Sequence, residues 1–239
     1  MKTILAFDTS GRTLTAALEH RGMLLCHTAE YGLRHSEHLI PAVRRILEQA
    51  ECSLSDIDLI AVSCGPGSFT GLRISMATAK GLAFGLDIPV VSVPTLDVYQ
   101  QQFSWFDGTV MPVIDARKNR YYTAAYRGGK RESDFLDLKA QDIIETASLS
   151  LPVLFAGPDA QAFSDELTRD GISYPQGIYF QVHDTSPPAR CLIEAAGRCY
   201  ALHGPDHITA GPLYIRKSEA ESLRSDKETK LREEHSHET

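Results

Sequence analysis

The sequence predicts an α/β fold built on a mixed sheet. Three observations predict it: apolar runs of strand length alternate with stretches of helical spacing, the chain opens with strands joined by tight turns, and a similar order of elements begins twice. Alternating strands and helices are typical of parallel sheets, whereas tight turns between consecutive strands need antiparallel pairing. A sheet that combines both kinds of pairing is therefore expected.

The first half of the chain supplies most of these signals. Strands are expected at 3–9, 14–19, 23–31, 58–63 and 89–95, and helices at about 37–50 and 70–85. The first helix has apolar residues at helical spacing, with Ser36 available as a cap and Pro41 in its first turn. The second is rich in small residues and has few polar positions, which indicates burial either inside the protein or against another chain.

A weak internal repeat begins after residues 100–108. The first strand of each half ends in an aspartate, Asp8 or Asp115, and a turn and another strand follow it. Repetition of a pattern without identity suggests two copies of one supersecondary unit. The second half predicts strands at 109–117 and 120–127, a strand with a glycine turn and a helix start at 151–160, and a helix from about Pro188 to Leu202.

The composition limits both partners and location. The 239 residues carry a net charge of −7, which counts against a chain that grips nucleic acid mainly through its own phosphate contacts. No apolar run reaches the length of a membrane-spanning helix, and Asp8 comes too early for a secretory signal, so a cytoplasmic location without membrane contact is expected. Five cysteines without a CxxC pair predict buried thiols.

The most informative motif is the glycine-rich turn from Cys64 to Arg73, CGPGSFTGLR, between a predicted strand and a predicted helix. Such a turn exposes backbone N–H groups at the positive end of a helix and could bind an anion. It lacks the Gly-Lys-Ser/Thr of a Walker A loop and the spacing of a dinucleotide-binding loop. A tight strand-to-helix connection with a helix cap is the alternative.

Asp8, Asp115 and Gly157 are candidates for a nucleotide cleft. If the two halves face each other, both carboxylates could line it and coordinate a magnesium nucleotide, with the glycine turn near the adenosine. The alternative is that each aspartate closes an Asx turn at a strand end. His35 and His38 are three residues apart instead of the four of a HExxH site, so no metal site is assigned.

The motifs closely resemble those of the bacterial TsaB (YeaZ) family. The resemblance covers about residues 1–220, and GPGSFTGLR is its specific part. It is carried, in chain order, by ILAFDTS, RHSEHLIP, AVSCGPGSFTGLRISMATAKGLA, VPTLD, IDARKNRYYTAAY, AGPDA and PLYIRKSEAE.

The resemblance implies two RNase H-like lobes of the actin-like ATPase (ASKHA) superfamily. It also implies a non-catalytic scaffold in the addition of threonylcarbamoyl to N6 of adenosine 37 in tRNAs that read ANN codons. The family pairs with its metal-bearing paralogue TsaD and with the ATPase TsaE, and tRNA binds through the complex. No catalytic residue is assigned here, and no cofactor is expected on this chain alone, although the pathway uses ATP.

The interface that the resemblance implies lies on the helices at 37–50 and 70–85, which pair with TsaD or with a second copy of the chain. The contact candidates are Leu39, Val43, Ile46, Leu72, Ser75, Met76 and Ala79. Two other classes stay open: an autonomous actin-like ATPase or phosphotransferase around Asp8 and Asp115, and a protease, for which no Ser, His and Asp constellation can be assigned.

Three regions are expected along the chain. Residues 1–104 would form the N-terminal lobe with the interface helices, and 105–217 a smaller C-terminal lobe. Residues 218–239 carry eleven charged residues and only two large apolar ones, Leu223 and Leu231. That composition predicts a disordered tail or a frayed helix.

Overall fold

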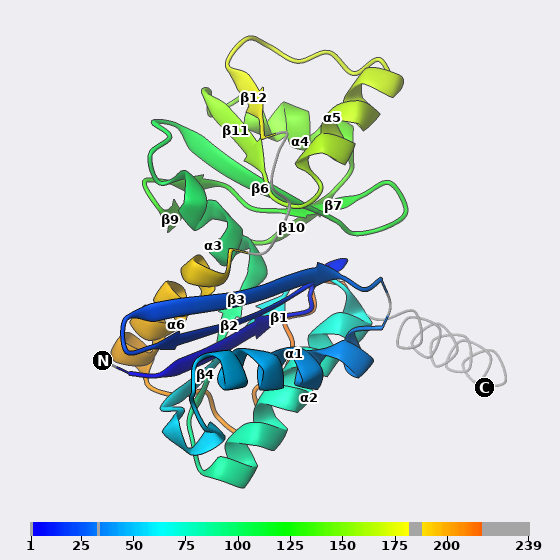
Figure 1. The fold of residues 1–239 in the computed structure, drawn as a ribbon. Helices are drawn as coiled ribbons and strands as arrows, with labels where there is room; N and C mark the ends of the chain where they lie inside the picture. The colour runs from blue at the N-terminus through cyan, green and yellow to red at the C-terminus, as the bar shows by residue number, and fades with distance from the viewer. Residues whose placement is uncertain (1, 33, 182–187, 217–239) are drawn as a thin grey trace, which may run out of the picture.

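A computed structural model describes residues 2–32, 34–181 and 188–216, and the predicted tail at 218–239 lies outside these residues. The described chain forms two lobes, each built on one β-sheet with helices against it (Figure 1). No helix in these ranges combines the length and the apolar character needed to cross a bilayer.

The N-terminal lobe contains a five-stranded sheet in the order β3-β2-β1-β4-β5. Its strands are β1 (Ile4–Asp8), β2 (Thr13–His20), β3 (Met23–Glu30), β4 (Leu59–Gly65) and β5 (Val90–Pro94). β2 pairs antiparallel with β1 and β3, whereas β4 pairs parallel with β1 and β5. The two central strands, β1 and β4, are buried along their whole length because helices cover both faces of the sheet.

Helices α1 (His35–Gln49) and α2 (Phe69–Leu86) pack on one face of this sheet, and the short η1 (Leu54–Asp56) follows α1. α1 begins two residues earlier than predicted, so Pro41 lies beyond its first turn and Ser36 is not the cap. α2 begins after Ser68, whose hydroxyl accepts the N–H of Gly71.

The C-terminal lobe repeats the same topology. Its strands are β6 (Thr109–Asp115), β7 (Tyr121–Thr123), β8 (Tyr126–Arg127), β9 (Lys130–Arg131), β10 (Leu136–Leu138), β11 (Val153–Ala156) and β12 (Ile178–Phe180). The main order is β10-β7-β6-β11-β12, and β6 pairs antiparallel with β7 and parallel with β11, as β1 does with β2 and β4. Asp8 and Asp115 end the corresponding strands β1 and β6, so the predicted internal repeat is confirmed.

Helices α4 (Ala140–Ala147) and α5 (Ala160–Arg169) cover one face of the second sheet. The short α3 (Thr95–Gln100) and η2 (Gln101–Phe103) connect the lobes, and Leu96, Tyr99 and Phe103 pack against strands β6 and β11. This apolar contact joins the end of the first lobe to the sheet of the second.

The last helix, α6 (Ala189–His203), corrects the predicted division of the chain. It was expected in the C-terminal lobe of 105–217, but Leu192, Ile193 and Ala196 are buried against the N-terminal sheet, on the face opposite α1 and α2 (Figure 1). Helical spacing predicts that a face will be buried but does not say which sheet buries it. Residues 204–216 then run along the N-terminal lobe toward the second lobe.

Candidate functional site

The carboxyl end of β1 carries Asp8, the first candidate ligand of the proposed cleft. Its side chain has no exposed surface. One carboxylate oxygen accepts the N–H of Ser10 at 2.6 Å, which is an Asx turn, and the other accepts the hydroxyl of Ser63 on β4. Both oxygens are therefore bound within the protein, as the Asx-turn alternative predicts.

The glycine-rich turn packs directly on this strand end. A Cβ at Gly71 would lie 1.8 Å from the carbonyl oxygen of Thr9, and one at Gly67 would lie 2.6 Å from that of Ser10. The Thr9 hydroxyl also donates to the Gly71 carbonyl at 2.7 Å. These two glycines are needed because α2 and its leading turn approach the β1–β2 turn more closely than any side chain allows.

Several backbone N–H groups of this turn already have partners in the protein. Ser68 donates to the Ser10 carbonyl at 2.6 Å, Leu72 donates to the Ser68 carbonyl at 2.9 Å, and Gly65 donates to the Thr95 hydroxyl at 3.1 Å. An anion-binding loop needs such groups directed at the ligand. The geometry therefore favours a tight strand-to-helix connection over an anion site.

We expect Asp8→Ala to destabilise the protein. The change leaves the N–H of Ser10 and the hydroxyl of Ser63 buried without their acceptor, so unfolding should become easier by about 2–4 kcal/mol. Asp8→Asn keeps one acceptor oxygen and should lose less. Urea denaturation of both variants measures the difference, and equal stability of Asp8→Ala and the unchanged protein would show that the buried carboxylate has no structural role.

The corresponding strand end in the second lobe is more open. The Asp115 side chain is 40% exposed, accepts the N–H of Arg117 at 2.7 Å and lies 3.3 Å from its guanidinium. The backbone N–H of Asp115 donates to Asp159, and burial together with the Asp115 charge raises the pKa of the Asp159 carboxyl. The positive charges of Arg117 and of Arg12, in the β1–β2 turn, oppose that rise.

Gly157 directly follows β11, beside Val113 on β6 and two residues short of Asp115, and has a φ of +93°. Its N–H donates to the side chain of Gln181 at 3.2 Å, and a Cβ there would lie 3.1 Å from the Val113 carbonyl oxygen. The backbone conformation and the close approach both favour glycine at this turn.

These residues fit a magnesium nucleotide poorly. Asp115 and Gly157 share one edge of the second sheet, but Asp8, in the first lobe, is sealed by Ser10 and Ser63 and offers no oxygen to a cation. Catalysis through a magnesium nucleotide needs carboxylate oxygens free to hold the ion. A nucleotide cleft stays a prediction, and the Asp8 side of it would have to rearrange.

The two histidines of the RHSEH motif have separate packing roles. His35 is buried, and its Nε2 lies 2.9 Å from the Gly11 carbonyl oxygen, whereas the ring of His38 stacks on Tyr31 with 3.8 Å between centroids. In the described residues, no three His, Cys, Asp or Glu side chains are grouped as metal ligands. Burial also raises the pKa of the Cys64 thiol to about 12, so this cysteine is unreactive near neutral pH.

The seven predicted contact residues are wrong as direct contacts. They lie on the inner faces of α1 and α2, and none exposes more than 4% of its surface, so they pack inside the first lobe. This set is Leu39, Val43, Ile46, Leu72, Ser75, Met76 and Ala79. Of the two explanations for the apolar character of α2, burial inside the protein accounts for these positions.

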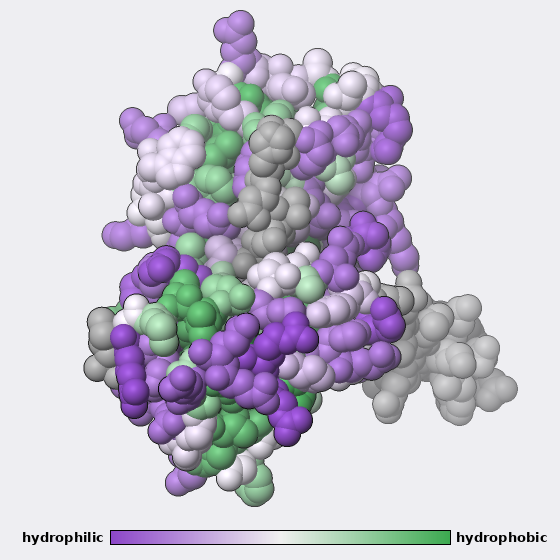
Figure 2. All heavy atoms as spheres, in the orientation of Figure 1, coloured by the Kyte–Doolittle hydropathy of each residue, from purple (hydrophilic) through white to green (hydrophobic). Residues whose placement is uncertain are grey.

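The solvent-facing side of the same helices carries other residues. Ile40 on α1 is 49% exposed, Phe84 on α2 is 85% exposed, and Ala77 and Gly81 also face solvent. Figure 2 shows apolar surface on the lower lobe, over η1 and the end of α2, next to the polar side of α1. We name the solvent-facing side of α1 and α2 the helix face. Sequence reasoning missed it because the selected residues form the apolar stripe of each helix, and that stripe is the one that packs inside the first lobe.

The helix face includes a groove of about 960 Å³ beside α1. Ile40, Arg44 and Glu48 on α1 line it together with Leu54 of η1 and Leu82 of α2. Its lining combines apolar side chains with charged groups of both signs, as protein–protein contact surfaces do.

Comparisons with known proteins agree with this architecture. The family model described as TsaD, tRNA N6-adenosine threonylcarbamoyltransferase, matches residues 29–183, more than half of the chain. The tRNA threonylcarbamoyladenosine biosynthesis protein TsaB of Bacillus subtilis (strain 168) is 33% identical over 233 residues, which cover 92% of this chain and 96% of that protein. TsaB of Escherichia coli (strain K12) is 31% identical over 226 residues, 91% of this chain and 96% of that protein.

Solved structures extend the similarity to the fold. YeaZ from Pseudomonas aeruginosa has a TM-score of 0.72 at 28% identity, and the match covers 90% of this chain and all of that one. A second structure from Pseudomonas aeruginosa, described as an uncharacterized protein with similarity to peptidase YeaZ, has a TM-score of 0.75 at 29% identity with the same coverage. The chain therefore belongs to the TsaD-related proteins and, among them, to the TsaB (YeaZ) family with its actin-like α/β fold.

Proposed function

We infer that this chain is a non-catalytic docking subunit in the biosynthesis of threonylcarbamoyladenosine in tRNA. Its membership of the TsaB family supports a role in that pathway. In this proposal it pairs with the paralogue TsaD, which holds the metal and transfers threonylcarbamoyl to N6 of adenosine 37 in ANN-decoding tRNAs. The ATPase TsaE joins the complex, the tRNA binds through it, and all of these act in the cytoplasm.

The observation that carries the non-catalytic role is the sealed carboxylate of Asp8. This carboxylate has no exposed surface, and both of its oxygens accept hydrogen bonds from within the protein. It therefore cannot bind a metal ion or accept a proton in the space between the lobes. A magnesium nucleotide held between the lobes needs accessible carboxylates from both, and of the two predicted aspartates Asp115 alone, 40% exposed, offers one. The autonomous ATPase is the weaker candidate for the same reason.

The helix face is the docking surface in this proposal. It presents Ile40 and Phe84 to solvent, and Ala77 and Gly81 leave room for the close approach of another helix. TsaD is a paralogue of the same fold, so it offers a helix pair of its own in the corresponding position. A second copy of this chain could use the same face when TsaD is absent.

Reconstitution tests the proposal. TsaD, TsaE, threonylcarbamoyl-adenylate synthase, ATP, threonine, bicarbonate and unmodified tRNA are combined with and without this chain. Modified adenosine should form only when the chain is present, because TsaD needs its docking subunit. Mass spectrometry of digested tRNA measures the product, and the chain alone serves as the control for ATP hydrolysis.

Two results would contradict the proposal. Modification at the same rate without the chain would show that no docking subunit is needed. ATP hydrolysis by the isolated chain, lost in Asp115→Asn, would instead favour the autonomous ATPase.

A further inference from the structure

Residues 204–216 form a strap that leaves α6 and follows the first lobe. The N–H of Asp206 donates to the Val90 carbonyl at 2.8 Å, and the Asp206 carboxylate accepts the N–H of Ser92 at 2.9 Å. Both partners lie on β5, the edge strand of the first sheet. The strap therefore begins by covering an otherwise unpaired sheet edge.

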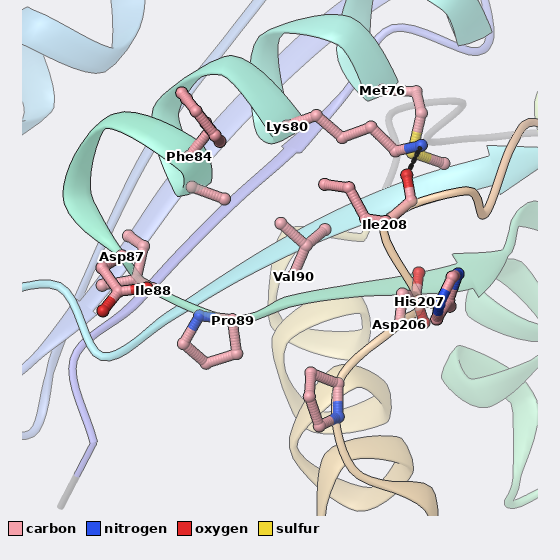
Figure 3. Close-up of a pocket in the computed structure, with 12 residues that line it drawn as sticks. Met76, Lys80, Phe84, Asp87, Ile88, Pro89, Val90, Asp206, His207 and Ile208 are labelled. Carbon is pink, nitrogen blue, oxygen red and sulfur yellow. Dashed lines mark hydrogen bonds between the residues drawn. The ribbon is translucent and has the colours of Figure 1, made fainter.

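Helix α2 holds the strap at two further places. The Lys80 ammonium donates to the carbonyl oxygen of Ile208 at 2.8 Å (Figure 3). It also donates to the carbonyl oxygen of Ala210. At the N-terminal end of α2, Arg73 donates to the Tyr214 hydroxyl at 3.0 Å, and the ring of Tyr214 stacks on Phe69 with 4.5 Å between centroids. The attachment to the first lobe is thus distributed over many contacts.

Between these places, the strap crosses the carboxyl end of β4. The N–H of Leu213 donates to the Cys64 carbonyl at 2.7 Å, and a Cβ on Gly65 would lie 2.6 Å from the Leu213 carbonyl oxygen. The space outside the carboxyl ends of the strands is where open α/β sheets bind ligands. Here the protein's own backbone occupies part of it.

The described strap ends on the second lobe through one side chain. Arg216 forms a forked ion pair with Asp137, with Nη2 at 2.7 Å and Nε at 2.9 Å from Oδ2, and donates to the Ala116 carbonyl at 3.3 Å. The Arg216 side chain is 32% exposed. Asp137 also accepts from Arg120 at 2.7 Å, so its charge keeps a partner when Arg216 leaves.

We propose that Arg216 is a releasable latch that holds the two lobes together. The strap is bound to the first lobe by its backbone and two α2 side chains, but to the second by this arginine. Its release leaves no buried charge alone, because Asp137 retains Arg120 and the guanidinium of Arg216, which is already partly exposed, enters water. The lobes then separate about their contact at α3, where the apolar cluster and the pairing of Asp97 with Tyr126 and Arg131 stay in place, without unfolding either sheet.

Distance measurement between spin labels tests the latch. One label replaces Glu48 on α1 and the other Asp165 on α5, both exposed and in different lobes. The three cysteines that are not buried are first changed to serine, namely Cys26, Cys191 and Cys199. The labelled protein that keeps Arg216 should give one narrow distribution of distances between the labels. Arg216→Ala should shift this distribution to longer distances. Raising the salt concentration should shift the protein with Arg216 in the same direction and leave Arg216→Ala unchanged.

A matched variant controls for the loss of an arginine. Arg169→Ala removes an exposed guanidinium that pairs with its neighbour Asp170 at 2.9 Å, and it should leave the distances unchanged. Asp137→Asn weakens the same latch without shortening any side chain. It should shift the distances in the same direction as Arg216→Ala, and it replaces that variant in the test if Arg216→Ala does not fold. Unshifted distances in a folded Arg216→Ala or Asp137→Asn protein, or an equal shift in Arg169→Ala, would overturn the latch. None of these readouts depends on TsaD or tRNA.

Discussion

Gly71→Ala is expected to destabilise the first lobe by about 3 kcal/mol or more. The added Cβ would lie 1.8 Å from the carbonyl oxygen of Thr9, far inside any van der Waals contact. Thr9 cannot move away freely, because it directly follows the buried strand β1 and its hydroxyl donates a hydrogen bond to the Gly71 carbonyl. Relief therefore requires α2 to shift away from the sheet, which opens the core beneath it.

Gly81→Ala is the matched control on the same helix. A Cβ at Gly81 meets nothing within 4 Å, so the change adds helix propensity without a clash. It should raise the free energy of unfolding by up to about 1 kcal/mol. Urea denaturation followed by circular dichroism measures both variants, and similar stabilities for the two would show that the turn at Thr9 yields to the extra methyl group.

The sequence predicted the fold well where the pattern was local. Strands ending in Asp8 and Asp115 indicated a repeat, and both sheets show the same strand order. The alternation of strands and helices in the first lobe also matched, to within a few residues at each end. These features depend on the spacing of apolar and polar residues along the chain, which the sequence contains directly.

Long-range packing could not be predicted in the same way. The spacing of apolar residues in α6 indicated that one side of the helix is buried, but it did not indicate that the N-terminal sheet buries it. Asp8 showed a carboxylate at a strand end, but only the fold brings Ser63 of β4 against it. The Arg216–Asp137 pair joins residues far apart in the chain, and no local pattern marks it.

The predicted contact residues were chosen on the buried side of α1 and α2 instead of on the helix face. Ser75 was selected as a contact, yet it has no exposed surface, and its hydroxyl donates to the Leu72 carbonyl at 3.2 Å. An arginine at Ser75 would therefore disrupt the core and would not report on docking. A variant that tests docking must lie on the opposite side of α2.

Ala77→Arg is such a variant, and we expect it to weaken pairing with TsaD at least about tenfold. Ala77 faces solvent in the middle of α2, where a long charged side chain would occupy the volume needed by an approaching helix. Arginine has nearly the helix propensity of alanine, so the isolated chain should keep its stability. Isothermal titration calorimetry with TsaD measures the affinity, and thermal denaturation of the free chain measures the fold.

Ala162→Arg provides the comparison, because it makes the same substitution at an exposed position of α5 in the other lobe. If the helix face is the docking surface, only Ala77→Arg loses affinity, and tRNA modification in the reconstituted system falls with it. Full affinity in Ala77→Arg would remove α2 from the interface. A loss confined to Ala162→Arg would place the interface on the C-terminal lobe, since the two variants add the same charge and the same bulk to helices of the same protein.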